Sequence, residues 1–159
     1  MQGTTFTRRT TILTLAALGS GAALPLRAQS TPRKVEVMKA DGCTCCEAWA
    51  DTLTAAGFAV TVQAVDEDRL TAERIAAGVP EGLYGCHAAK LGNLRLEGHV
   101  PAEDIVRLQA DGADAAGLSV TGMPAGSPGM EMGGAREAFD VVLWRRDGST
   151  EVFRHYDAI

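Results

Sequence analysis

Three cysteines stand within four residues of this chain, in the run Cys43-Thr44-Cys45-Cys46. Metal binding and redox chemistry are the usual reasons for such a density of thiols outside disulfide scaffolds. Thiolate sulfur is a soft ligand, which suits Cu(I), zinc or an iron–sulfur cluster far better than magnesium or calcium. Cys43 and Cys46 also form a CxxC pair, which can cycle between a dithiol and a disulfide. The rest of the fold must therefore accommodate several thiols gathered at one turn of the chain.

Structural disulfides are the alternative explanation for these cysteines. The chain has four cysteines, which allow three pairings, and exported proteins usually oxidise their thiols. A disulfide framework, however, spaces its cysteines to join distant loops. Cys45 and Cys46 are adjacent and join each other only through a strained eight-membered ring. We therefore favour metal or redox chemistry over structural bridges.

The first 28 residues have the features of an export signal. Arg8-Arg9 precede an apolar run from Ile12 to Leu26, and Ala28 is a plausible cleavage point. The arginine pair followed by a mild, Gly/Ala-rich stretch resembles the twin-arginine type, with an ordinary Sec signal as the alternative. The apolar run has 15 residues, interrupted by glycine and proline, whereas a membrane span needs about 20. We expect a periplasmic protein with no membrane span after processing.

The processed chain would keep 131 of the 159 residues, enough for one compact domain with a core of its own. Losing residues 1–28 removes three arginines and no acid, so the formal net charge changes from −5 to −8. Nucleic acid is an unsuitable partner for this charge, because binding it needs clustered cations. We expect a monomer whose acidic surface is compatible with meeting cations.

The apolar pattern predicts alternating strands and helices up to Gly117. The predicted elements are a strand at 35–38 followed by an Asp41-Gly42 turn, a helix from Glu47 that stops at Gly57, a strand at 58–65, a helix capped by Asp66 and closed by Gly78 and Pro80, a strand ending at Leu91, a Gly92-Asn93 turn, a strand at 94–97, and a helix opened by Pro101 that turns Ile105, Val106 and Leu108 toward the core. A thioredoxin-like sheet requires this order, with CxxC between the first strand and the first helix.

The last 42 residues have a different character. Glycine, proline and methionine crowd the stretch after Gly117, where no regular element is expected. Residues 139–144 and 150–153 then flank Asp147-Gly148, which predicts a terminal β-hairpin. We therefore predict an α/β protein with a thioredoxin-like domain at 33–117, formed by a sheet with flanking helices. Residues 118–159 form a C-terminal extension, a Gly/Pro/Met loop and a β-hairpin, packed on the same domain.

The thioredoxin-like arrangement places the CxxC at the N-terminus of the first helix. Unpaired backbone N–H groups and the helix dipole lower the pKa of a thiol there, and this favours both redox chemistry and metal binding. A simple redox pair of Cys43 and Cys46 gains nothing obvious from Cys45, so the third sulfur favours a metal. Cys86 precedes the third strand, in the loop that thioredoxin-like domains bring against the CxxC. We expect Cys86 to act as a metal ligand or as a resolving thiol.

The histidines are assigned by their distance from these motifs. His87 stands where that loop often carries a cis-proline, and its imidazole would complete a site for copper or zinc. We expect His99 to cap an element or to support a ligand, and His155 to be exposed. Trp49 is expected to pack in the core against the sheet.

Three methionines in the C-terminal loop offer thioether sulfur, namely Met123, Met130 and Met132. Thioethers remain ligands in an oxidising compartment and favour Cu(I) over zinc. In a flexible loop, methionine more often covers a hydrophobic patch. We count the three as possible metal ligands.

Several separate motifs resemble one known family, the CopG-type exported CxCC proteins found with bacterial copper-resistance genes and long catalogued as a domain of unknown function. The matching residues are Cys43-Thr44-Cys45-Cys46 followed by Trp49, then Gly85-Cys86-His87, Gly98-His99-Val100-Pro101, Gly122-Met123-Pro124 and Gly126-Ser127-Pro128-Gly129-Met130-Glu131. The resemblance covers nearly all of the chain after the export signal.

The resemblance implies a thioredoxin-like domain with a C-terminal extension that helps to bind metal. It also implies copper held by the CxCC sulfurs and a role in interconverting Cu(I) and Cu(II) for resistance. The sequence departs from the family pattern at Asp41-Gly42, where Pro-Thr is usual, and at Ala88, where threonine is usual. The missing hydroxyls change the hydrogen bonding around the ligands, while the sulfur ligands are retained.

Three hypotheses follow for the function. The first is a periplasmic copper-binding protein in which Cys43, Cys45 and Cys46 bind Cu(I). In this hypothesis Cys86, His87 and the loop methionines complete or gate the site, and several bridging thiolates could hold more than one Cu(I). Zinc is the less favoured occupant, and components of copper efflux or resistance are the expected partners. The second is an oxidoreductase that cycles Cys43 and Cys46 as catalytic residues, with copper or without metal. The third is a disulfide-stabilised binding module.

Overall fold

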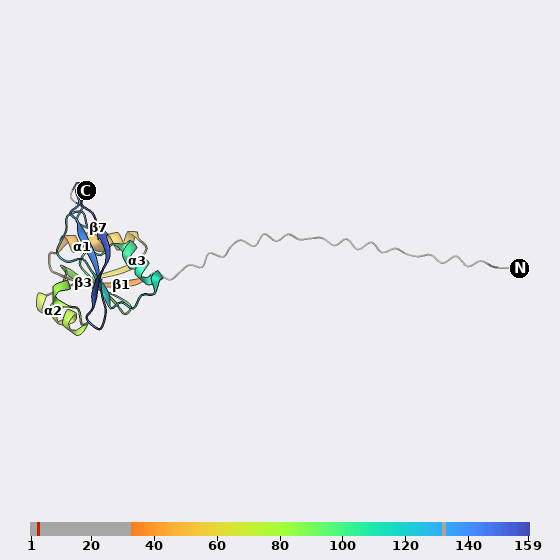
Figure 1. Ribbon diagram of the computed structural model, residues 1–159, viewed down its shortest axis with the longest axis horizontal. Helices are drawn as coiled ribbons and strands as arrows, with labels where there is room; N and C mark the ends of the chain where they lie inside the picture. Colours follow the sequence, from red (N-terminus) through yellow and green to blue (C-terminus); the bar gives the residue numbers. More distant parts are fainter. Residues whose placement is uncertain (1–2, 4–32, 132) are drawn as a thin grey trace. The chain divides into compact units, whose positions relative to one another are not determined.

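The structure is a computed structural model that describes residue 3 and residues 33–131 and 133–159 (Figure 1). The predicted export signal at 1–28 and Met132 lie outside these residues, apart from Gly3. Residues 33–131 and 133–159 belong to one compact unit. Within the described residues, no helix has the length and apolar character that crossing a bilayer demands.

A single seven-stranded sheet runs through this unit in the order β2-β1-β3-β4-β5-β6-β7. Its strands are β1 (Lys34–Ala40), β2 (Ala59–Val65), β3 (His87–Leu91), β4 (Leu94–Glu97), β5 (Gly117–Ser119), β6 (Phe139–Trp144) and β7 (Thr150–Tyr156). The helices are α1 (Thr44–Ala55), α2 (Glu67–Ala76) and α3 (Ala102–Asp111), with a short 3₁₀ turn, η1 (Glu81–Leu83). The order β-α-β-α-β-β-α predicted up to Gly117 is confirmed.

The pairing of the first four strands confirms the thioredoxin-like fold. β1 and β2 are parallel and are joined through α1, whereas β3 is antiparallel to both β1 and β4. Gly92 closes the tight β3–β4 turn with a φ of 59°, a backbone conformation that glycine adopts without steric cost. At the start of α2, the side chain of Asp66 accepts a hydrogen bond from the Arg69 amide at 2.7 Å, so the predicted cap is present.

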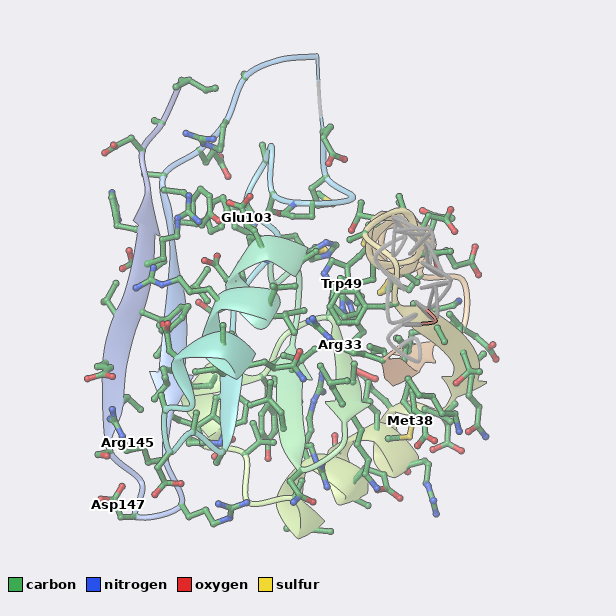
Figure 2. The ribbon with its side chains drawn as sticks, turned by 90° about the vertical axis from the view of Figure 1, so that its right-hand side faces the viewer. Arg33, Met38, Trp49, Glu103, Arg145 and Asp147 are labelled. Carbon is green, nitrogen blue, oxygen red and sulfur yellow. A yellow bond between two sulfur atoms is a disulfide. The ribbon has the colours of Figure 1, made fainter. Side chains whose placement is uncertain are left out.

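The hydrophobic core lies between one face of the sheet and helices α1 and α3. Trp49 and Leu53 of α1 and Ile105 of α3 are fully buried against strand residues such as Val35 and Leu96. Figure 2 shows α3 in front of the sheet and Trp49 beside it, on the side toward α1. The prediction for Trp49 is confirmed. Val106 was predicted to face this core, and that is wrong: it is 39% exposed, because it lies one residue past Ile105 on a helix whose buried face also carries Asp104 and Leu108.

α2 covers the opposite face of the sheet, beside β1 and β3. Its buried side chains are Leu70 and Arg74. Arg74 reaches the side chain of Glu97 at the end of β4. Arg74 and Glu97 therefore form a buried charged pair between α2 and the sheet. The pair lies near the loop before β3 that carries Cys86.

Strand β5 was not predicted, because it is three residues long and has no alternating pattern. It pairs parallel with β4 and antiparallel with β6, so the predicted terminal hairpin extends the same sheet. Gly117 lies under the Trp144 ring, where a Cβ atom would collide with the indole. The position of β5 thus depends on a residue without a side chain at Gly117 and on the large ring of Trp144. The local sequence pattern does not reveal this dependence.

The predicted start of α1 and the predicted end of β7 each differ from the structure by three residues. α1 begins at Thr44, three residues before the predicted start at Glu47, so the cysteines form its first turn. β7 extends to Tyr156 beyond the predicted end at residue 153, because Phe139 and Tyr156 pair across the hairpin with their rings stacked at 4.6 Å.

Candidate metal centre

The cysteine cluster is built on the N-terminus of α1. Gly42, at a φ of 74°, turns the chain out of β1, and the Cys43 amide donates to the Ala40 carbonyl at 3.3 Å. Cys43 is the N-cap residue, and no side chain caps the helix there. The first backbone N–H groups of a helix lack partners within it, and they carry the positive end of its dipole. The sequence thus places three sulfurs where negative charge is stabilised.

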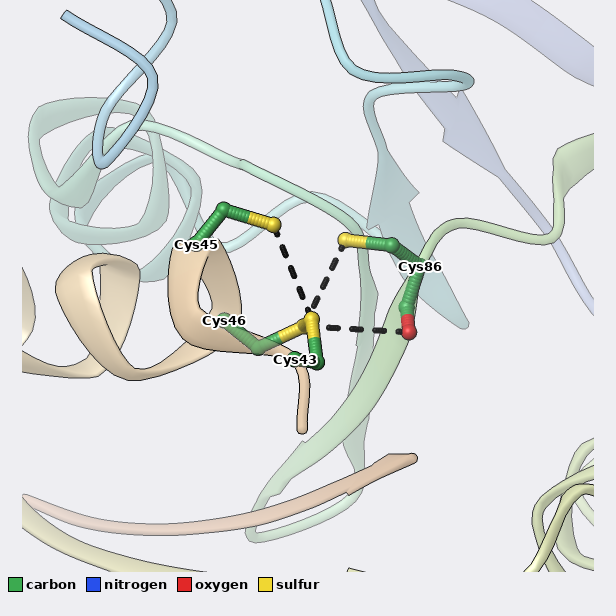
Figure 3. A group of neighbouring side chains, drawn as sticks. All are labelled: Cys43, Cys45, Cys46 and Cys86. Carbon is green, nitrogen blue, oxygen red and sulfur yellow. Dashed lines mark hydrogen bonds between the residues drawn. A yellow bond between two sulfur atoms is a disulfide. The ribbon is translucent and has the colours of Figure 1, made fainter. Parts of the chain in front are cut away.

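Cys43 and Cys46 form a disulfide in this structure, and Cys45 and Cys86 are free thiols (Figure 3). The Cys45 sulfur lies 3.6 Å from the Cys43 sulfur. The Cys86 sulfur approaches from the other side, 3.7 Å from that of Cys46. Each free thiol is therefore in contact with one half of the disulfide.

The four sulfurs lie within 4.8 Å of one another. Cys46 is fully buried, and the other three cysteines are half-buried. Three of these sulfurs come from one helical turn, and the fourth comes from the loop before β3, forty residues later in the chain. This donor set is soft, compact and partly shielded from solvent, and it fits a thiophilic metal ion once the disulfide is reduced.

A second group of possible ligands shares Cys86. The sulfur of Cys86 lies 3.2 Å from Nδ1 of His87 and 3.1 Å from Nε2 of His99. All three donor atoms lie within 4.8 Å of one another, and both histidines are fully buried. Cys86 therefore stands between a group of sulfur donors and a group of imidazoles.

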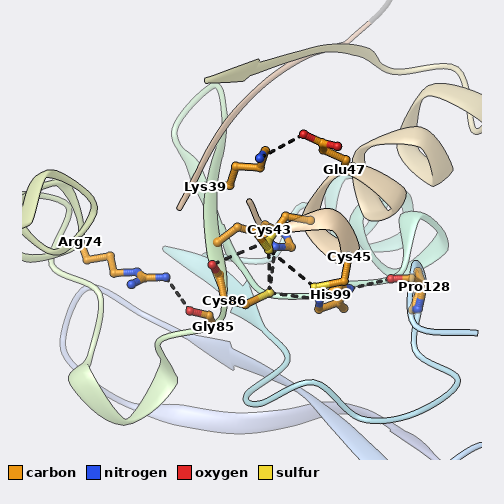
Figure 4. The surroundings of a disulfide bond; sticks show 11 residues. Lys39, Cys43, Cys45, Glu47, Arg74, Gly85, Cys86, His99 and Pro128 are labelled. Atoms are coloured by element: carbon orange, nitrogen blue, oxygen red, sulfur yellow. Dashed lines mark hydrogen bonds and ion pairs between the residues drawn. A yellow bond between two sulfur atoms is a disulfide. The ribbon is translucent and has the colours of Figure 1, made fainter. Parts of the chain in front are cut away.

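The hydrogen bonds define which nitrogen of His99 can accept. Nδ1 of His99 lies 2.7 Å from the carbonyl oxygen of Pro128, which only accepts, so Nδ1 carries the proton (Figure 4). Nε2 then presents its lone pair toward the sulfur of Cys86. In metal sites, ligating histidines are commonly oriented by a hydrogen bond of this kind on the other ring nitrogen. Among the described residues, Nε2 of His87 has no hydrogen-bond partner, although it is buried.

Burial keeps these groups neutral in the absence of a metal. Burial raises the pKa of the Cys86 thiol to about 12, and the neighbouring Cys45 adds to this effect. Burial also lowers the pKa of His87 to about 3, assisted by His99 and Arg74, and lowers the pKa of His99. The imidazoles are thus available as neutral ligands at neutral pH, whereas Cys86 must release a proton when it binds a metal ion.

From the sequence, His99 was expected to cap an element or to support a ligand. In the structure it contacts Cys86 directly. Its position comes from Gly98, which has a φ of 65° and lies so close to the Val120 carbonyl that a Cβ atom would collide with it. This turn directs His99 back toward Cys86. The run Gly98-His99-Val100-Pro101 was the available signal, since a glycine at the end of a strand indicates a turn or a close approach of the backbone.

The C-terminal loop packs on the first turn of α1. Gly129, at a φ of 82°, faces the Trp49 amide and the Cys45 carbonyl so closely that a Cβ atom would not fit. The next residue, Met130, is half-buried, and its backbone bonds to Gly126 and Ser127. Met123 is 56% exposed and lines a separate hollow beside Phe139. The loop thus packs against the cysteine turn at Gly129, the residue that precedes Met130.

Trp49, His155 and Lys39 have separate roles. The ring centroids of Trp49 and His87 lie 4.3 Å apart, and Nε1 of Trp49 donates to the Val100 carbonyl at 2.9 Å. Trp49 therefore packs against one of the histidines of the cluster. His155 is exposed as predicted and pairs with Asp140 at 2.6 Å. Lys39, at the end of β1, is buried, and its ammonium pairs with Glu47 on α1 at 3.1 Å (Figure 4).

Two solved structures resemble this chain over most of its length. One, described as copper resistance protein copG, form 1, is 38% identical, with a TM-score of 0.75, and the match covers 80% of this chain and 99% of the other. The second, form 2 of copper resistance protein copG, is 40% identical, with a TM-score of 0.73 and coverages of 79% and 99%.

The chain belongs to the CopG family.

A family model described as a protein of unknown function, DUF411, matches residues 83–130. No curated protein sequence matches the chain. The segment matched by the family model contains Cys86, His87 and His99 and the loop through Met130. It therefore spans the part of the site that faces the CxCC turn.

Proposed function

We propose that this protein binds Cu(I) through the thiolates of Cys43, Cys45, Cys46 and Cys86. The observation that carries the proposal is the gathering of four sulfurs within 4.8 Å at a helix N-terminus. Thiolate donors select Cu(I), zinc and iron–sulfur clusters, and the similarity to copper resistance proteins at 38–40% identity favours copper among these. Bridging thiolates in so small a space suit more than one Cu(I).

His99 and His87 complete the proposed site through Cys86. Imidazole suits copper as well as zinc, and His99 already has the tautomer and the orientation that a ligand needs. Met130 is proposed as a thioether ligand contributed by the loop, and Met132 is proposed with it from outside the described residues. Met123 is exposed and lines a separate hollow, so it would join them only by leaving that hollow. In this arrangement the loop covers the thiolate cluster and limits access of water to it.

We further propose that Cys43 and Cys46 couple copper binding to a change of oxidation state. Two Cu(II) ions each gain one electron while the two thiols lose two electrons and two protons and form the Cys43–Cys46 disulfide. The reverse reaction oxidises two Cu(I) as the disulfide takes up two electrons and two protons. The disulfide in the structure supports this proposal, because it joins these two sulfurs without displacing Cys45 or Cys86 from the cluster.

Residues 1–28 and the similarity to copper resistance proteins together suggest a cellular role. We propose export to the periplasm by a twin-arginine or Sec signal and a role as a monomer in copper resistance, with efflux or resistance components as partners. In this role the protein would take up copper ions and present them in one oxidation state.

A metal-free thiol oxidoreductase is the second candidate function. The Cys43–Cys46 disulfide at the start of α1 favours it, because this is the position of a thioredoxin-type redox pair. This function needs neither Cys45 nor the two histidines. The free thiols beside the disulfide are therefore what separates the two candidates.

The two candidates are distinguished by an anaerobic titration of the reduced protein with Cu(I) against a chromophoric chelator, with zinc as the control metal. The proposal predicts that the wild type takes up Cu(I) in competition with the chelator. A variant with serine at Cys43, Cys45 and Cys46 should lose this uptake. If the wild type fails to compete while its thiols still form a reversible disulfide, the metal-free function is correct.

A further inference from the structure

Two buried charged side chains lie outside the donor cluster and have no part in the copper chemistry proposed above. Arg74 of α2 is 5% exposed, and Glu97 at the end of β4 is 1% exposed. Nε of Arg74 donates to Oε2 of Glu97 at 3.0 Å. Burying such a pair removes both charges from water, and pairs of this kind are often no more stabilising than packed apolar side chains. Stability alone is therefore a weak reason for the pair to be here.

Both partners also bind the backbone of Gly85, the residue before Cys86. Nη2 of Arg74 donates to the Gly85 carbonyl at 2.6 Å, as Figure 4 shows. Oε2 of Glu97 accepts from the Gly85 amide at 3.1 Å. The pair thus satisfies the two polar groups of one residue in an irregular segment. Apolar replacements would leave both groups buried without partners.

The same segment is held on its other sides. Gly85 packs so closely on the Gly98 backbone that a Cβ atom would collide with it, and it forms a bridge to Gly122. One residue earlier, the Tyr84 ring lies 5.0 Å from the Arg74 guanidinium. The hydroxyl of Ser119 donates to the Leu83 carbonyl at 2.7 Å. Residues 83–85 are therefore fixed by α2, β4 and β5 together.

The anchoring of Gly85 affects both the group of sulfur donors and the group of imidazole donors. Cys86 directly follows the anchored residue, and its sulfur lies 3.7 Å from that of Cys46 and 3.1 Å from Nε2 of His99. Glu97 stands two residues before His99, with Gly98 between them. The pair therefore connects the backbones that carry Cys86 and His99, from the face of the sheet opposite the core.

We propose that Arg74 and Glu97 are positioning residues that hold the Cys86 sulfur against the CxCC turn. The ion pair sets the backbone of Gly85, and Gly85 sets the direction of the Cys86 side chain. The consequence for copper affinity rests on the proposed function. The consequence for the location of Cys86 does not, because it concerns the metal-free protein.

The first test measures alkylation of each cysteine in the reduced, metal-free protein by mass spectrometry. Arg74→Met removes the donor to the Gly85 carbonyl and is expected to make Cys86 react several-fold faster, while Cys45 keeps its rate. Glu97→Leu should have the same effect. Glu97→Gln keeps an acceptor for the Gly85 amide and should restore most of the protection. Equal Cys86 rates in wild type, Arg74→Met and Glu97→Leu would overturn the proposal.

Loss of stability alone must be separated from loss of position. Leu70→Ala is the matched control, since Leu70 is fully buried on the same helix and its truncation leaves Arg74 and Glu97 in place. This variant should unfold at a clearly lower urea concentration than wild type and still protect Cys86. If Cys86 is exposed equally in Leu70→Ala and in an Arg74→Met protein that retains its fold by circular dichroism, the effect is general loosening and the positioning role is wrong.

The second test is Cu(I) affinity, where removal of a group that orients a ligand typically costs about 10- to 100-fold. Arg74→Met is expected to fall in this range and Glu97→Gln to lie closer to wild type. Should wild type bind no Cu(I), the proposed function fails, while the alkylation rates still decide the positioning role. Should wild type bind Cu(I) and Arg74→Met bind it equally tightly, the positioning role is wrong for the metal site.

Discussion

Nδ1 of His99 donates a hydrogen bond to the Pro128 carbonyl across 2.7 Å. This bond joins the turn after β4 to the loop of the C-terminal extension. It also leaves Nε2 of His99 as an acceptor 3.1 Å from the Cys86 sulfur. The extension thereby orients a side chain of the cluster without contributing that side chain itself, and this gives the loop a function that does not depend on its methionines.

We expect His99→Ala to reduce Cu(I) affinity by about 10- to 100-fold, because it removes both an oriented imidazole and its contact with Cys86. Competition with a chromophoric Cu(I) chelator measures the change. His155→Ala is the matched control, since that histidine is exposed on β7 and pairs with Asp140. Equal losses in the two variants would argue against a role for His99 in the site.

Gly129→Ala should loosen the loop from α1. The new methyl group would collide with backbone atoms of Cys45 and Trp49, and the displacement would pull the Pro128 carbonyl from His99. Cu(I) affinity is expected to fall by about 10-fold or more. Gly133→Ala imposes a similar backbone strain, of about 1–2 kcal/mol, at a φ of 74° with open space around the new methyl. The account requires this second variant to bind Cu(I) nearly as wild type does.

Cys45→Ser separates metal binding from disulfide formation. The variant loses one of the four sulfurs but keeps both halves of the Cys43–Cys46 pair. We expect Cu(I) binding to weaken several-fold and the disulfide to form normally, as followed by thiol titration and mass spectrometry. Unchanged affinity and copper stoichiometry would show that Cys45 is not a ligand.

Trp49→Ala should lower the free energy of unfolding by about 3–5 kcal/mol, the usual cost of truncating a large buried aromatic side chain. The residue is fully buried, and its loss also leaves the Val100 carbonyl without the indole donor. Urea unfolding followed by circular dichroism measures the change. A loss below about 1 kcal/mol would contradict its place in the core.

The pH dependence of stability should include a contribution from His155. Its hydrogen bond to Asp140 raises the pKa of His155, and Asp157 adds to this effect. The stabilisation is therefore complete below the unfolded pKa, about 6.5, and is lost as the pH rises through the higher folded pKa. Urea unfolding at about pH 6 and pH 8 should show a larger loss for wild type than for His155→Gln. A larger loss in the variant would reverse the assigned direction.

Much of the fold follows from local pattern. The strand and helix order up to Gly117, the Asp66 cap and the terminal hairpin at Asp147-Gly148 are each encoded in short stretches. β5 and the role of Gly117 are not, because they depend on the Trp144 ring, which comes from a strand later in the chain. The start of α1 was placed too late because cysteine and threonine are weak helix formers that tertiary contacts hold in the first turn.

The site residues that are close together in the sequence were predicted, and those that are isolated in the sequence were missed. Three cysteines within four residues indicate metal or redox chemistry, and Cys86-His87 is identified by its place at the start of β3. His99 depends on a turn at Gly98 that only the packing against Val120 explains. Arg74 could not be assigned a role from sequence, since one arginine on an amphipathic helix normally faces solvent. Its burial becomes understandable only with Glu97 and Gly85 beside it.

The most direct test of a thiolate copper site is X-ray absorption at the copper edge, measured on the anaerobically loaded wild-type protein and on Cys86→Ser. We predict a nearest shell made mainly of sulfur in the wild type, with fewer sulfur neighbours per copper in the variant. A nearest shell of nitrogen and oxygen alone would contradict the assignment of Cys43, Cys45, Cys46 and Cys86 as copper ligands.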